Sequence, residues 1–110
     1  MMEAIREILL NLGCNPSADG TEYLAQAVAA RISNPKALLL DLCADIARGV
    51  DGLTVPQMQF EMRDVIRAAC ADDEFSRISK KLQRPAGASG VYSLGDFVDL
   101  VAAYVVRGAK

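Results

Sequence analysis

The chain has 110 residues and a formal net charge of −2. That length supports one domain with its own core, and a composition of 52 % hydrophobic and 24 % charged residues is typical of a folded protein rather than a disordered one. No His, paired carboxylates, phosphate-binding Gly-rich loop or Cys-x-x-Cys motif is present, so we expect neither an enzyme nor a bound cofactor or metal.

The first third of the chain predicts two helices joined by a loop. Apolar residues recur at helical spacing up to Gly13, which ends the first helix. Residues 15–20 are turn formers, and Asp19 is the expected cap of a second helix over 21–32. The apolar residues of these two helices are Ile5, Ile8, Leu9, Leu12, Leu24, Ala27, Val28 and Ile32.

The next segment predicts a third and a fourth helix separated by a short turn. Pro35 is expected to open the third helix, over 35–48, because a proline fits the first helical turn. Residues 49–53 form the turn, and Thr54 is the expected N-cap of a fourth helix that continues to Ala71. The inward positions of the third helix are Leu38, Leu39, Leu42, Cys43 and Ile46.

The last third predicts two further helices with a loop between them. A fifth helix follows the acidic residues 72–74, and the loop over 83–92 contains one proline and two glycines. Ser93 and Asp96 match the S-x-x-D signal for the start of a final helix, which continues to Arg107. Since no strand pattern appears, we predict a single all-α domain of six helices over residues 1–110.

The turn and the fourth helix together have the form of a helix-turn-helix. One stripe of this helix is apolar and consists of Val55, Met58, Met62, Val65, Ile66 and Ala69. The opposite face carries Gln57, Phe60, Arg63, Asp64 and Arg67. An anchored helix with protruding first turns suits DNA reading, because Gln pairs with adenine and Arg with guanine. A solvated helix face in any all-helical domain has the same composition, so this alternative stays open.

Charge along the chain gives a mixed indication. Glu61 and Asp64 oppose DNA binding, since carboxylates are repelled by phosphates. Four cations fall within eight residues with no acid between them: Arg77, Lys80, Lys81 and Arg84. Such a run is either a solvated helix face or a set of phosphate contacts beside a reading helix.

Four stretches carry a resemblance to a known family. They are ILLNLG at 8–13, GTEYLAQAV at 20–28, DIAR at 45–48 with the turn and helix that follow, and FVDLVA at 97–102. The second is similar to the family's G-x-x-Y-L-x-x-A-[IV]. The chain thereby resembles, over nearly its whole length, the DNA-binding effector domain of the stage-zero sporulation protein A family, response regulators of endospore-forming bacteria. This resemblance implies a six-helix domain with an embedded helix-turn-helix that binds promoter DNA, often as a head-to-tail pair.

The departures from the family pattern fall in the reading helix. The family's T-x-S-R-V-E-R corresponds here to residues 54–60, where Thr54 as cap and Met58 as core position are kept. The base-contacting positions are occupied instead by Pro56, Gln57, Gln59 and Phe60. No receiver domain with a phosphoacceptor Asp fits in the chain. We therefore expect a free-standing regulator with altered DNA specificity.

Two functional hypotheses follow from these patterns. In the first, the chain is a transcriptional regulator that binds double-stranded DNA, its site formed by Gln57, Gln59, Phe60, Arg63, Arg67, Lys80, Lys81 and Arg84. In the second, it is a degenerate effector fold that binds protein, either a second copy or a related regulator, through Phe60 and the alanines of the last helix. Neither hypothesis involves a small-molecule substrate or a membrane.

The cysteines and the N-terminus indicate the compartment. Cys14, Cys43 and Cys70 are odd in number and not closely paired, as in proteins of a reducing compartment. Cys43 and Cys70 stand among apolar helix positions and are expected to be buried thiols. Because the chain also shows no signal peptide and no membrane-spanning run, we expect a cytoplasmic protein.

Overall fold

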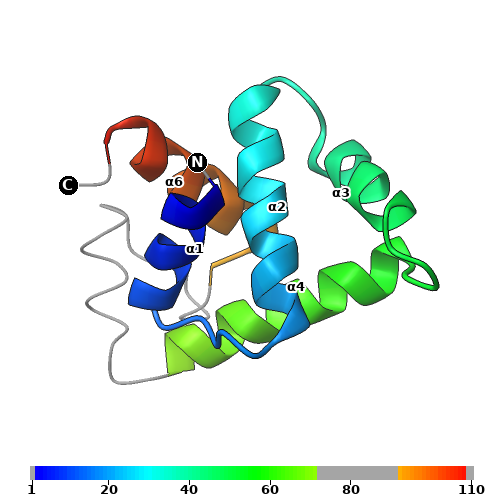
Figure 1. The fold of residues 1–110 in the computed structure, drawn as a ribbon, viewed down its shortest axis with the longest axis horizontal. Helices are drawn as coiled ribbons and strands as arrows, with labels where there is room; N and C mark the ends of the chain where they lie inside the picture. Colours follow the sequence, from blue (N-terminus) through cyan, green and yellow to red (C-terminus); the bar gives the residue numbers. More distant parts are fainter. Residues whose placement is uncertain (1, 72–91, 109–110) are drawn as a thin grey trace.

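The computed structural model describes residues 2–71 and 92–108, whose arrangement Figure 1 shows. These residues form five α-helices and no strand, which confirms the all-α class. The helices are α1 (Met2–Asn11), α2 (Asp19–Ser33), α3 (Leu39–Arg48), α4 (Val55–Ala71) and α6 (Leu94–Val106). The predicted fifth helix and the loop after it lie outside the described residues. Within the described ranges, no helix combines the length and the apolar character required to cross a bilayer.

Helix α2 is the centre of the fold. It contacts α1, α3, α4 and α6, and in Figure 1 it stands between α1 and α3 with its N-terminal end on α4. A helix packed on several sides needs small residues, and Ala25 and Ala27 are both fully buried. At Gly20 the backbones of α2 and α4 come close together, because a Cβ built there would lie 2.3 Å from the carbonyl oxygen of Glu61.

The first helix ends as predicted, whereas the second begins differently. Gly13 adopts a φ of +99°, a conformation suited to glycine at the end of a helix. The predicted cap Asp19 is wrong: Ala18 is the N-cap residue without a side-chain hydrogen bond, and Asp19 is already helical. Asn15 organises this loop instead. Its side chain accepts a hydrogen bond from the N–H of Ser17 at 2.9 Å, and its carbonyl accepts one from the hydroxyl of Thr21.

The predicted start of the third helix at Pro35 is also wrong, since α3 begins at Leu39. The guanidinium of Arg31 donates hydrogen bonds to the carbonyls of Pro35 and Ala37, which an earlier helix would have used for its own first turns. Leu38 therefore stays extended as the N-cap residue and is 70 % exposed, not buried as predicted. Further along α3, Leu42 and Cys43 do face the core.

The predicted starts of the last two described helices are confirmed. The hydroxyl of Thr54 accepts a hydrogen bond from the N–H of Gln57 at 3.2 Å, and the hydroxyl of Ser93 accepts one from the N–H of Asp96 at 3.2 Å. Each hydroxyl thereby satisfies a backbone donor that has no partner within the helix. The three cysteines are free and buried, as expected for Cys43 and Cys70.

Candidate nucleic-acid interface

Helix α4 is held by one apolar stripe. Five of the six residues predicted for that stripe are buried, and Val55 at the helix start is half-buried. The stripe packs against α2, α3 and α6. Because it is confined to one side, the other side of the helix is exposed to solvent from Pro56 to Ala68.

The outward side of α4 carries four of the residues predicted to contact DNA. Gln57, Phe60, Arg63 and Arg67 are all exposed, and 64 % of Phe60 is accessible. Asp64 lies on the same side, with its carboxylate 3.8 Å from the guanidinium of Arg67. A single exposed apolar side chain is common on protein surfaces, so the exposure of Phe60 fits both a contact surface and an ordinary solvated face.

Gln59 and Arg63 lie at the edge of this outward side, toward α3 and α6. Gln59 is half-buried, and both residues influence the thiol of Cys43 on α3. Burial raises the pKa of Cys43, while a hydrogen bond with Gln59 and the positive charge of Arg63 act in the opposite direction. The two side chains therefore reach along the flank of α4 rather than straight outward.

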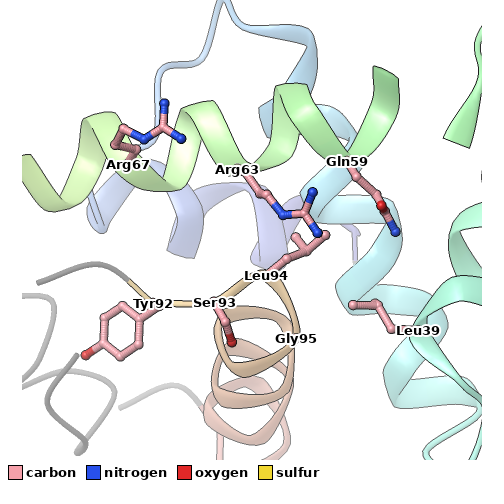
Figure 2. Close-up of a pocket in the computed structure, with 8 residues that line it drawn as sticks. All are labelled: Leu39, Gln59, Arg63, Arg67, Tyr92, Ser93, Leu94 and Gly95. Atoms are coloured by element: carbon pink, nitrogen blue, oxygen red, sulfur yellow. The ribbon is translucent and has the colours of Figure 1, made fainter. Parts of the chain in front are cut away.

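This flank of α4 borders a hollow of about 280 Å³, which we call the α4–α6 hollow. Figure 2 shows Gln59 and Arg63 extending from α4 toward Leu39 and Leu94, which come from α3 and α6. Arg67 lines the same hollow at the end where Tyr92 lies. The remaining lining residues are Ser93 and Gly95.

The charged residues that line the α4–α6 hollow are two arginines. Among the described residues, its lining includes no carboxylate, although Asp64 lies beside Arg67. In the part of the chain that the structure describes, Arg63 forms no ion pair, whereas Arg6, Arg31, Arg48 and Arg67 each have a carboxylate nearby. The N-terminal end of α6 carries a partial positive charge, which the carboxylate of Asp96 in its first turn opposes.

The residues of α3 and α6 at this site were not predicted as functional. Ser93 was identified only as a helix cap, and nothing in the sequence around Leu39 or Gly95 indicates that they lie beside Arg63. Their proximity depends on how α6 packs against α4, which periodicity does not reveal. The predicted phosphate contacts Lys80, Lys81 and Arg84 lie outside the described residues.

A second hollow lies between the end of α2 and α6. It has a volume of about 510 Å³ and a mainly apolar lining that includes Ile32, Pro35, Ala103 and Val106. At its border, Nε of Arg31 lies 2.9 Å from the carboxylate of Asp99. Ala103 was predicted as part of a protein interface; Ala102, predicted with it, is almost fully buried.

Within residues 2–71 and 92–108, no three potential metal ligands gather in one place. Comparison of the chain with protein-family models, with curated proteins and with solved structures found no match.

Proposed function

We propose that this chain is a sequence-specific DNA-binding transcriptional regulator of the cytoplasm. In this proposal α3, the turn over 49–54 and α4 act as a helix-turn-helix related to that of the sporulation regulator effector domain, with α4 as the reading helix. The observation that supports this proposal most strongly is the division of α4 into two sides. One side is a buried apolar stripe, and the other exposes two arginines, a glutamine and a phenylalanine. A helix fixed on one side and polar on the other fits the requirements of major-groove recognition.

The roles of the first exposed residues follow from their chemistry. Gln57 lies in the first turn of α4, where recognition helices make most of their base contacts, and its amide suits the N6 and N7 edge of adenine. Phe60, one turn later, presents an apolar ring that suits a thymine methyl group. The net charge of −2 does not oppose this assignment, because phosphates respond to the local charge around α4 and α6.

Selection from a random duplex library, followed by fluorescence anisotropy at two salt concentrations, tests the proposal. We expect an enriched motif and an affinity that falls steeply as salt rises, because phosphate contacts release counterions. Gln57→Ala should weaken binding by roughly 1–3 kcal/mol and relax preference at one base pair. Gln26→Ala on α2 removes the same side chain away from α4 and should leave affinity unchanged. Absence of binding at low salt would rule the proposal out.

A protein-interaction role is the second candidate, and two observations favour it. Phe60 is 64 % exposed on α4, and Val106 is 70 % exposed beside the apolar hollow between α2 and α6. If these surfaces pair two copies, light scattering after size-exclusion chromatography will show a dimer without DNA, and Phe60→Ala will convert it to a monomer. Leu10→Ala, on α1 and 44 % exposed, is the matched control. A parent protein that stays monomeric at high concentration argues against this role.

A further inference from the structure

The flank of α4 differs from its outward side in what faces it. On the outward side, Phe60 and Asp64 point into open solvent. On the flank, Arg63 extends toward Leu94 at the beginning of α6 and Gln59 extends toward Leu39 at the beginning of α3, and both line the α4–α6 hollow (Figure 2). If the outward side enters a major groove, its flank faces one of the two phosphate backbones that border that groove.

The hollow has the features that a phosphate group requires. Its volume of about 280 Å³ is ample for a phosphate group, and Gln59, Arg63 and Arg67 are among its lining residues. Of the two arginines, Arg63 extends toward Leu94, whereas the guanidinium of Arg67 points away from Tyr92 (Figure 2). Arginine suits this role, because its planar fork of N–H donors matches phosphate oxygens. Arg63 has no carboxylate partner among the described residues, so none of their carboxylates competes with a phosphate for its guanidinium.

We infer that the α4–α6 hollow receives one phosphate of the DNA backbone, with Arg63 as its main contact and Gln59 as a further donor. This inference rests on the proposed function, and it changes the roles predicted for both residues from base reading to positioning. Specificity then depends on Gln57 and Phe60, while Arg63 fixes the register of α4 in the groove and holds the beginning of α6 against the backbone.

Base contacts and phosphate contacts can be told apart by how the affinity for DNA depends on the DNA sequence and on salt. Loss of a base contact relaxes specificity at one position, whereas loss of a phosphate contact weakens binding uniformly and lowers the salt slope by about 1. The first test therefore compares Arg63→Gln with the parent on the selected duplex and on its single base-pair variants, over a range of salt concentrations. Arg107→Gln, at the far end of α6, removes the same charge away from the hollow as the matched control.

We expect Arg63→Gln to reduce affinity by roughly tenfold on every duplex and to lower the slope of log K against log salt by about 0.9. Arg107→Gln should leave affinity and slope close to those of the parent. A loss that is confined to one base pair, or no loss at all, overturns the inference while the proposed function stands. A parent protein that binds no duplex overturns both.

A second pair of variants tests the hollow from α6. A Cβ at Gly95 meets only the side chain of Leu39, at 3.8 Å, so a short side chain fits there. Gly95→Asp introduces a carboxylate opposite Arg63, and Gly95→Asn introduces a neutral side chain of the same shape. We expect Gly95→Asp to bind all duplexes at least tenfold more weakly than Gly95→Asn, since a carboxylate repels phosphate. Equal affinities of these two variants overturn the inference.

Discussion

Replacement of Gly20 by alanine tests the packing on which the position of α4 depends. Gly20 is the second residue of α2, and its Cα faces the backbone of α4. An added Cβ would lie 2.3 Å from the carbonyl oxygen of Glu61, 2.7 Å from its carbonyl carbon and 2.8 Å from a methyl group of Val65. Two of these three atoms belong to a helix backbone, so they cannot rotate away, and the helices must separate.

The expected cost follows from two opposing terms. Overpacking of a well-filled core costs about 1–3 kcal/mol, and contacts with backbone atoms place this site at or above the upper end. Alanine is favoured over glycine within a helix by roughly 0.5–1 kcal/mol, which offsets part of that cost. We therefore expect Gly20→Ala to destabilise the fold by about 2 kcal/mol or more, which lowers the Tm of a domain of this size by roughly 8 °C.

The chain offers a matched control in Gly95, which is also the second residue of its helix. Its added Cβ meets only Leu39, at an ordinary contact distance of 3.8 Å, so Gly95→Ala gains helix propensity without overpacking. Thermal and urea unfolding, followed by circular dichroism, should show Gly20→Ala as destabilised and Gly95→Ala as neutral or slightly stabilised. The reasoning is refuted if Gly20→Ala unfolds at the parent temperature, or if both variants lose equal stability.

Three further predictions concern single contacts. Thr54→Ala should cost about 1 kcal/mol in urea unfolding, because it removes the cap of α4, and Thr54→Ser should restore most of that loss. Cys14 should resist alkylation at pH 8 in the native state, since burial, and secondarily Cys70, raises its pKa from 9.0 to about 12; rapid labelling without denaturant would contradict this. Hydrogen bonding to Arg6 lowers the pKa of the Glu22 carboxyl, so the unfolded chain takes up its proton first as the pH falls. Stability from this pair is therefore complete above the ordinary glutamate range and is lost as the pH drops below it, and Glu22→Gln should reduce the dependence of Tm on pH in that window.

Features that depend on neighbouring residues were predictable from the sequence. The C-terminal end of α1 follows from Gly13 and the start of α4 follows from Thr54, since each residue acts within one helical turn. The buried and exposed sides of α4 follow from the spacing of its apolar residues, because a helix repeats every 3.6 residues wherever it packs. The candidate residues Gln57 and Phe60 were found on the exposed side for the same reason.

Other features required the tertiary structure. Pro35 is a valid local signal for a helix start, yet α3 begins at Leu39, because the side chain of Arg31 folds back onto the carbonyls of Pro35 and Ala37, four and six residues further on. Apolar spacing does not reveal such a side-chain contact, even a short-range one. The need for glycine at Gly20 appears only when α4 lies across it.

The candidate site shows the same division. The sequence by itself determined that Arg63 lies on a helix with one buried and one exposed side. Only the packing of α6 against α4 decided that Arg63 faces Gly95 across a hollow whose described lining residues include no carboxylate. Periodicity fixes the direction of a side chain relative to its own helix, but its surroundings depend on contacts between segments that are far apart in the chain.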